Sequence, residues 1–172
     1  FDIDEISKAV KNVKPIKGRA EIVPINKKFN VMIDYAHTPD GLQNILSCVR
    51  EITKGKVILV FGCGGDRDKS KRAEMGRIAG EMSDVAVVTS DNPRNENPLL
   101  IINDILCGME KSKARIAVIE NRRQAIEFAL SKAKKGDLVL LAGKGHETYQ
   151  ITENEKIPFD EREIIKEYFK EI

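Results

Sequence analysis

The sequence has no tryptophan, only three cysteines and no apolar run of the roughly 20 residues that a membrane-spanning helix needs. It also shows no signal-peptide pattern at its start, so we expect a cytoplasmic protein with no membrane partner. Neither sign of charge dominates, since 29 basic and 27 acidic side chains are interleaved, and this argues against a nucleic-acid partner. We interpret Arg122 and Arg123 as a solvated helix start rather than a binding patch.

The cysteines and glycines argue against several kinds of site. Cys48, Cys63 and Cys107 are odd in number and never spaced as Cys-x-x-Cys, so we predict neither a disulfide framework nor a zinc site. We interpret all three as small apolar residues, with Cys63 a candidate loop thiol. The turn at 62–67 ends in arginine where a dinucleotide fingerprint needs glycine, and Gly143-Lys-Gly-His is no Walker loop. Neither a nucleotide-dependent oxidoreductase nor an autonomous NTPase is supported.

Apolar runs and helical stretches alternate along the chain, whose 41% hydrophobic and 33% charged content is that of an ordinary globular domain. Strands are expected at 29–33, 56–61, 85–88, 115–119 and 137–142, and helices at 42–49, 75–82, 99–106 and 125–133. This pattern predicts an α/β, Rossmann-like, doubly wound fold with a mostly parallel sheet of about six strands. Residues 149–159 are expected to supply an irregular or antiparallel edge strand, and 161–169 a closing helix.

The turn Asp91-Asn92-Pro93-Arg94 directly follows the apolar run at 85–88. Pro93 fixes its own φ and holds Asn92 out of the helical region, so the turn can keep Arg94 in one direction. Arginine can bind a carboxylate bidentately, and Asn92 can accept from an ammonium or donate to a carboxylate. The turn is therefore typical of a site for a small zwitterion. A plain helix cap is the alternative, because Asp and Asn before Pro often start a helix.

Polar turns follow four of the five predicted strands. In parallel sheets, ligands bind outside the carboxyl ends of the strands, so we expect these turns to lie along one edge. Their glycines allow the backbone to approach a ligand closely. The residues expected at this edge are Asp34, His37, Arg67, Asp91, Asn92, Arg94, His146 and Glu147. Because both histidines of the chain belong to this set, we favour a functional cluster.

Four ordered motifs together resemble the C-terminal domain of the Mur ligases, most closely that of the UDP-N-acetylmuramoyl-tripeptide synthetases. They are residues 34–40 (Asp-Tyr-Ala-His-Thr-Pro-Asp), 62–68 (Gly-Cys-Gly-Gly-Asp-Arg-Asp), 91–94 (Asp-Asn-Pro-Arg) and 143–147 (Gly-Lys-Gly-His-Glu). Gly18-Arg19-x-Glu21 resembles the hinge of these enzymes. The resemblance implies that residues 1–18 are the tail of a central domain and the hinge, and that 19–172 form the domain that binds amino acid and nucleotide. The start at Phe1 rather than Met also suggests a piece of a longer protein.

The resemblance implies an ATP-dependent, ADP-forming ligase of peptidoglycan synthesis that adds meso-diaminopimelate to UDP-N-acetylmuramoyl-L-alanyl-D-glutamate through an acyl phosphate. ATP and Mg²⁺ would serve the full-length enzyme, a monomer, with no cofactor tightly bound to this chain and no catalytic residue or metal ligand within it. The implied diaminopimelate-binding residues are Arg67, Asp91, Asn92, Pro93, Arg94, Gly143 and Glu147. Asp34 and His37 are expected at the nucleotide.

The last residue of the Asp-Asn-Pro-Arg motif carries the expected specificity, since lysine-adding members of the family have another residue there. Diaminopimelate is essentially lysine with a second α-carboxylate, which Arg94, with Arg67, can neutralise, while Glu147 can pair with the distal ammonium. The chain lacks a Gly-x-x-x-x-Gly-Lys-[Ser/Thr] phosphate loop, so we expect it to bind the amino acid weakly and not to turn over.

Two alternatives stay open at this point. One is a sister ligase, either lysine-adding or similar to folylpolyglutamate synthase. The other is a non-catalytic α/β binding module, which would not explain Arg, Asn and Glu at three strand ends. Asp68, Lys71 and Arg72 could equally contact nucleotide phosphates or be solvated charges of a first helical turn, and Arg19 could line an interdomain cleft.

Overall fold

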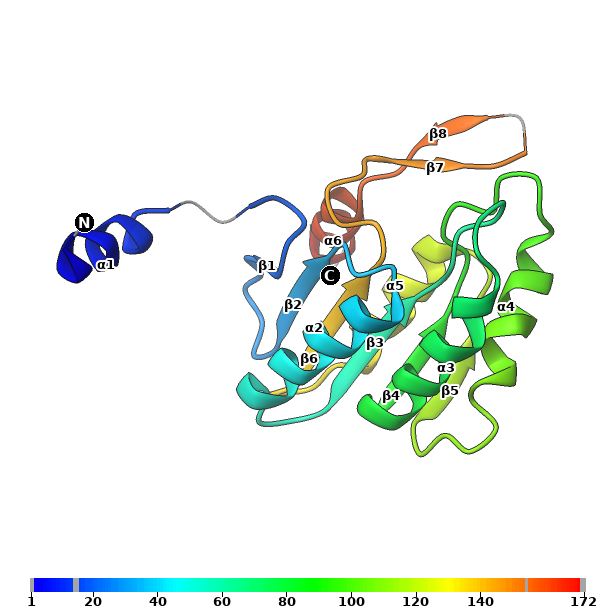
Figure 1. Ribbon diagram of the computed structural model, residues 1–172, viewed down its shortest axis with the longest axis horizontal. Helices are drawn as coiled ribbons and strands as arrows, with labels where there is room; N and C mark the ends of the chain where they lie inside the picture. The colour runs from blue at the N-terminus through cyan, green and yellow to red at the C-terminus, as the bar shows by residue number, and fades with distance from the viewer. Residues whose placement is uncertain (1, 14–15, 154, 171–172) are drawn as a thin grey trace.

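A six-stranded sheet organises the fold, in the order β1-β2-β6-β3-β4-β5 (Figure 1). The computed structural model describes residues 2–13, 16–153 and 155–170, so the expectations for Phe1 and for residues 14 and 15 lie outside the described part. The strands are β1 (Glu21–Val23), β2 (Asn30–Asp34), β3 (Val57–Phe61), β4 (Val85–Val88), β5 (Arg115–Val118) and β6 (Leu138–Ala142). Every neighbouring pair is parallel except β1 and β2. The predicted α/β class and mostly parallel sheet are confirmed.

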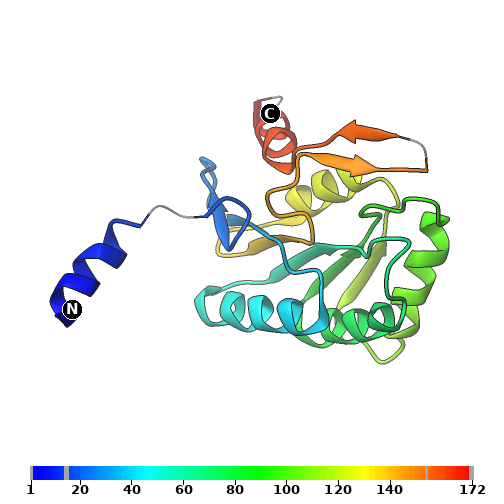
Figure 2. The ribbon, with the colours of Figure 1, turned by 45° about the horizontal axis from the view of Figure 1, so that its top comes forward.

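Helices cover both faces of the sheet (Figure 2). The helices are α1 (Ile3–Lys11), α2 (Pro39–Ile52), α3 (Ser70–Met82), α4 (Pro98–Cys107), α5 (Arg122–Lys132) and α6 (Glu161–Lys170). One core cluster joins α2, α3 and α4 to alternate residues of the strands, and a second cluster joins α5 and α6 to the intervening ones. Strands β3 and β6 are buried along their whole length, which explains why they are continuous apolar runs.

The antiparallel edge strand is β1, not the segment 149–159 where we expected it. Residues 149–159 instead contribute β7 (Tyr149–Ile151) and β8 (Lys156–Pro158), which pair only with each other in a separate two-stranded sheet (Figure 1). Two hydrogen bonds hold β7 against the loop after β4 instead of against the edge of the large sheet. The Ile151 N–H donates to Asn92 Oδ1 at 3.0 Å, and the Arg94 N–H donates to the Ile151 carbonyl at 3.2 Å. The predicted closing helix is confirmed as α6.

Helix α4 is capped by Asn97, whose side chain accepts from the Leu99 N–H at 2.8 Å, and Pro98 occupies its first turn. Asp91 and Asn92 therefore do not cap this helix, and the capping-turn alternative is wrong. Helix α1 is exposed along the part that the structure describes. Within residues 2–13, 16–153 and 155–170, no helix has both the length and the apolar character needed to cross a membrane.

The cysteines differ from one another. Cys63 lies in the loop after β3, as expected, but it is buried with its Sγ 3.7 Å from Met75 Sδ, and burial raises the pKa of its thiol to about 12. Cys48 and Cys107 are exposed, although we interpreted them, like Cys63, as small apolar residues.

Candidate functional site

The polar turns lie at one edge of the sheet because β2, β6, β3 and β4 are successive parallel neighbours. Asp34 ends β2 and His37 lies in the turn after it, while the turn after β6 carries Gly143 and Glu147. The turn after β3 carries Arg67, and the turn after β4 carries residues 91–94. Their side chains nevertheless fall into separate groups, which are described in turn.

Asn92, Lys144 and Glu147 form the centre of the first group. Asn92 Nδ2 donates to Glu147 Oε2 at 2.9 Å, and Lys144 Nζ donates to Asn92 Oδ1 at 2.9 Å and to Glu147 Oε2 at 3.3 Å. Asn92 is 4% exposed and Lys144 is fully buried. Lys144 was not among the expected site residues, although it lies within the Gly-Lys-Gly-His-Glu motif at 143–147. The available signal was a lysine between two glycines directly after a fully apolar strand.

The glycines beside Lys144 permit close packing of the turn. Gly143 has φ +112°, and a Cβ there would lie 2.9 Å from Asp91 Oδ2. Gly145 has φ +52°, and a Cβ there would lie 2.6 Å from the Tyr35 Cβ. A side chain at either position would therefore strain the backbone and push the turn away from its neighbours.

Arg94 adopts φ +53°, a conformation uncommon for a non-glycine residue, and its side chain turns back across the loops. Its Nη1 donates to the Gly65 carbonyl at 2.8 Å and to the Asn92 carbonyl at 3.3 Å. Among the described residues, neither Nε nor Nη2 of Arg94 has a hydrogen-bond partner. Arg67 is exposed, and its Nη1 donates to the Asp66 carbonyl at 3.0 Å. Both guanidinium groups thus retain free donors.

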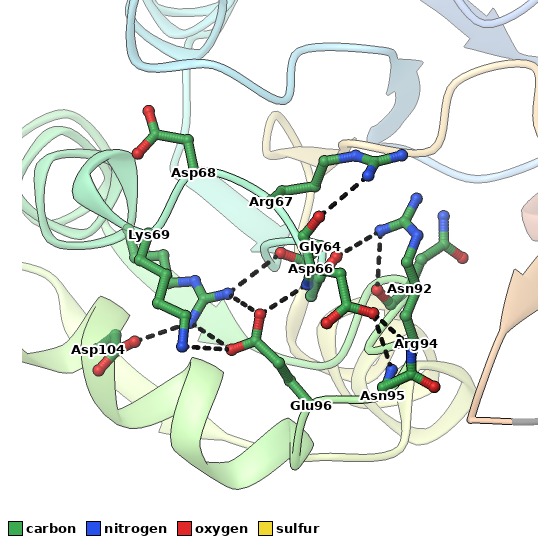
Figure 3. A network of polar contacts seen from close by, with 12 residues as sticks. Gly64, Asp66, Arg67, Asp68, Lys69, Asn92, Arg94, Asn95, Glu96 and Asp104 are labelled. Carbon is green, nitrogen blue, oxygen red and sulfur yellow. Dashed lines mark hydrogen bonds and ion pairs between the residues drawn. The ribbon is translucent and has the colours of Figure 1, made fainter.

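A polar network fixes the loop after β3 against the loop after β4 (Figure 3). Arg72 is 1% exposed and donates to both carboxylate oxygens of Glu96 at 2.8 and 3.0 Å, and to Asp104 Oδ2 at 2.8 Å. Glu96 also accepts from the Asp66 N–H at 2.6 Å and pairs with Lys69. These donors, Arg72 foremost, lower the pKa of Glu96 to about 2. Arg72 is therefore a buried cross-link between the loops that carry Arg67 and Arg94, not a solvated charge.

Arg122 is also buried, so its interpretation as a solvated helix start is wrong. Its Nε donates to Glu161 Oε1 at 2.9 Å, its Nη2 donates to the Ala142 carbonyl at 2.9 Å, and its Nη1 lies 3.9 Å from Asp91 Oδ2. Arg123, by contrast, is 47% exposed and pairs with Glu167. Arg122 thus connects the starts of α5 and α6 to the end of β6, beside Asp91.

Asp34 and His37 belong to a second group that surrounds Tyr35. Asp34 Oδ2 accepts from the Ala20 N–H at 2.7 Å and its Oδ1 from the Ala36 N–H at 2.8 Å, so this carboxylate holds the backbone of both turns. The rings of His37 and His146 lie 4.7 and 5.0 Å from that of Tyr35. Arg19 Cζ lies 4.7 Å above the same ring. His146 therefore packs with the Tyr35 group rather than with Asn92 and Glu147.

The segment Gly18-Arg19-x-Glu21 packs directly on the turn after β6. A Cβ at Gly18, which has φ +73°, would overlap the backbone of Gly145 and His146. Glu21 accepts from the Gly18 N–H at 2.6 Å and pairs with Arg162, which in turn donates to the Gly145 carbonyl at 3.1 Å. Arg162, the foremost of these partners, and the Gly18 N–H lower the pKa of Glu21.

Two further features delimit the site. An open groove runs between the β7–β8 hairpin and the start of α5, and Pro93 and Arg94 line it whereas Asn92 and Glu147 do not. Within the part of the chain that the structure describes, no group of three or more His, Cys, Asp or Glu side chains is placed to hold a metal ion.

Comparisons with known proteins identify the family. The family model described as "Mur ligase, glutamate ligase domain" matches residues 18–145. UDP-N-acetylmuramoyl-L-alanyl-D-glutamate--2,6-diaminopimelate ligases of Caldanaerobacter subterraneus subsp. tengcongensis and Clostridium botulinum are 56% and 52% identical over 156 and 169 residues. These alignments cover 91% and 97% of this chain but 32% and 35% of the relatives. The chain thus spans about a third of the length of the curated relatives it matches.

Solved structures agree with the fold and the family. The structure of a UDP-N-acetylmuramoyl-L-alanyl-D-glutamate--2,6-diaminopimelate ligase superimposes with a TM-score of 0.85 at 35% identity, covering 99% of this chain and 35% of that one. A bifunctional folylpolyglutamate synthase/dihydrofolate synthase from Yersinia pestis CO92 has a TM-score of 0.64 at 18% identity, over 85% of this chain and 32% of that one, and shares the fold alone. With the four strand-end motifs in place on this fold, the chain belongs to the Mur ligase family, as its glutamate ligase domain.

Proposed function

We propose that this chain is the C-terminal part of an ATP-dependent, ADP-forming ligase that adds meso-diaminopimelate to UDP-N-acetylmuramoyl-L-alanyl-D-glutamate in the cytoplasm. In this proposal residues 1–18 belong to the tail of a central domain and the hinge, and 19–172 form the domain that receives the amino acid. The names of the relatives at 52–56% identity support the substrate, and the fold match at a TM-score of 0.85 supports the domain assignment.

The observation that carries the proposal is the hydrogen bond between Asn92 and Glu147, which joins the turn after β4, where Arg94 also lies, to the turn after β6. Glu147 Oε2 is occupied by Asn92 and Lys144, whereas Oε1 has no hydrogen-bond partner among the described residues and can accept from the distal ammonium. The free Nε and Nη2 of Arg94, together with Arg67, supply donors for the distal carboxylate. In the same proposal Gly143 lets the ligand approach the backbone closely, and Asp91 and Pro93 shape the turn that carries Asn92.

The same arrangement accounts for a preference over lysine. Lysine has no distal carboxylate and would leave the guanidinium of Arg94 without a charged partner. A hydrogen bond to a charged group contributes about 1.5–3 kcal/mol, which corresponds to roughly 10- to 100-fold in affinity. We therefore expect at least that preference for diaminopimelate.

In the full-length enzyme, ATP supplies the phosphoryl group that activates the dipeptide carboxylate, with Mg²⁺ as the accompanying cation. The residues of this chain bind the amino acid, orient its amine and, on domain closure, help to exclude water. Asp34 and His37 are proposed at the nucleotide. Asp34 acts there by holding the turn, since both of its oxygens accept backbone N–H groups, while the exposed His37 ring beside Tyr35 offers a contact surface.

Calorimetric titration of this chain and of the full-length enzyme with meso-diaminopimelate, and in parallel with L-lysine, tests the proposal. We expect binding of diaminopimelate, weaker binding of lysine, and a loss of roughly 10- to 100-fold in diaminopimelate affinity for Arg94→Ala. Arg77→Ala, which removes an exposed arginine of α3 that pairs with Glu74 and Glu81, is the matched control and should bind as the unmodified chain does. Equal binding of lysine would favour a sister ligase, and tripeptide formation by this chain alone would contradict the need for the other domains.

A further inference from the structure

Lys144 is a buried charge that the proposed function does not use. It lies two residues after the end of β6, between Gly143 and Gly145, and its side chain is fully buried. Its Nζ lies 6.0 Å from the centroid of the Tyr149 ring and 5.9 Å from that of Phe159. An ammonium group in such surroundings is costly unless it is paired and hydrogen-bonded, so its contacts determine what it does there.

Those contacts control the orientation of the Asn92 carboxamide. Asn92 Oδ1 accepts from Lys144 Nζ at 2.9 Å and from the Ile151 N–H at 3.0 Å, which occupies both of its lone pairs. Nδ2 uses one N–H on Glu147 Oε2 at 2.9 Å. A carboxamide fixed in this way presents only an N–H to a ligand. Asn92 can then donate to a carboxylate but cannot accept from an ammonium, which removes one of the two roles that its sequence allows.

The Lys144 ammonium also gives the two carboxylate oxygens of Glu147 different roles. Oε2 accepts from both Asn92 and Lys144, at 2.9 and 3.3 Å, and Oε1 is left for an incoming donor. Lys144 also partly neutralises this carboxylate. A ligand ammonium therefore meets one defined acceptor atom.

We propose that Lys144 is a positioning residue for amino-acid selection, which makes Asn92 a donor and directs Oε1 of Glu147 toward the ligand ammonium. This inference rests on the proposed function, because it assigns donor and acceptor atoms to the two ends of the same amino acid. Lys144 itself does not contact the ligand in this arrangement.

The charges around Lys144 agree with this role. Burial lowers the pKa of Lys144, and the positive charge of Arg122 acts in the same direction. Asp91, Glu147 and Glu161 oppose that shift by favouring the ammonium form. Three carboxylates on separate segments thus favour the ammonium form, and one of them, the proposed ligand contact Glu147, bonds to it directly at 3.3 Å.

The test compares the full-length enzyme with Lys144→Met, which keeps the length of the side chain and removes both the charge and the donors. We expect the KM for meso-diaminopimelate to rise by about 10- to 100-fold with a much smaller change in kcat, because the loss falls on binding. Lys144→Met in a Glu147→Gln background should add little, because the carboxylate that Lys144 positions is then already lost. Lys166→Met, which removes an exposed lysine of α6 that pairs with Glu163, is a lysine control outside this cluster.

A second measurement reports on the position of Asn92 without any ligand. In this chain, the side-chain amide signal of Asn92 in nitrogen-15 NMR should shift and exchange faster in Lys144→Met than in the unmodified protein. Lys144→Gln, which keeps a donor but no charge, replaces the methionine variant if that variant does not fold, and should move KM in the same direction.

The outcomes separate the two proposals. An unchanged KM with an unshifted Asn92 amide, or effects that simply add in the double variant, would overturn the role of Lys144 and leave the proposed function intact. If the unmodified full-length enzyme does not use diaminopimelate, the proposed function fails and the assignment of ligand ends fails with it. The Asn92 amide then shows whether Lys144 fixes the carboxamide.

Discussion

Arg72→Met tests whether the buried cross-link in Figure 3 holds together the two loops that carry Arg67 and Arg94. The substitution removes a guanidinium that is 1% exposed and bonded to Glu96 and Asp104, while methionine fills part of the same volume. Breaking a buried pair by removing one partner costs about 3–5 kcal/mol. The cost here is smaller, because the Asp104 side chain is 48% exposed and Glu96 keeps its bonds to Asp66 and Lys69.

We expect a loss of about 2–3 kcal/mol in the free energy of unfolding at neutral pH, or a fall of roughly 4–12 °C in Tm for a domain of this size. The pKa of Glu96 is lowered from 4.5 to about 2, and Arg72 is the largest cause. Since the folded pKa is the lower one, this stabilisation is complete above the unfolded pKa and is lost as the pH falls from about 5 toward about 2. After a reduction for solvent screening at Glu96, this pH-dependent stabilisation amounts to about 2 kcal/mol.

Urea unfolding of the unmodified chain and of Arg72→Met, at several pH values between neutral and about 3, measures both effects. The variant should be less stable at neutral pH, and the two curves should converge on the acid side. Arg77→Met is the matched control, because Arg77 lies on the same helix and pairs with Glu74 and Glu81 in solvent, so its removal should change stability far less. The reasoning would be refuted if the two variants were equally stable at neutral pH. It would also be refuted if Arg72→Met lost as much stability on acidification as the unmodified chain does.

Two further predictions concern the turn after β6 and the buried thiol. Gly143→Ala should lower the free energy of unfolding by about 1–3 kcal/mol in urea, because it combines a positive φ with a Cβ 2.9 Å from Asp91 Oδ2. Gly136→Ala, where φ is +88° but the nearest atom is 3.8 Å away, should cost less, and equal losses would mean that the close approach is unimportant. Cys63 should resist alkylation at pH 8 in the folded protein, because burial raises its pKa to about 12, while the two exposed cysteines react. Three rapid modifications by mass spectrometry would contradict the buried position.

Most of the sheet could be predicted because β2, β3, β4 and β5 are apolar runs that are each followed by a helix, and because β6 is a fully apolar run. The expected strand at 85–88 is β4 as the structure has it, and the expected strands at 56–61 and 137–142 each begin one residue before β3 and β6. Strands β1, β7 and β8 could not be found in the same way, since each has only three residues, too few for a periodic signal, and Val23 is the one buried residue among those nine. The edge strand was therefore expected in the wrong segment.

The site was partly predictable for a related reason. The motif residues could be identified from local chemistry and placed at one edge by the rule for parallel sheets. The buried cations Arg72, Arg122 and Lys144 could not, because each is defined by a partner far along the chain. Their partners Glu96, Glu161 and Asn92 are 24, 39 and 52 residues away. A charged residue in the first turn of a helix has the same local sequence pattern whether it is solvated or paired in this way.

The place of β6 in the sheet has a consequence for biosynthesis. β6 is the last strand of the large sheet to be synthesised, yet it lies between β2 and β3 and supplies hydrogen bonds to both. A ribosome-bound chain that ends before residue 138 therefore has two partial sheets with unpaired, apolar inner edges. These edges stay open to pairing with other chains until β6 has emerged.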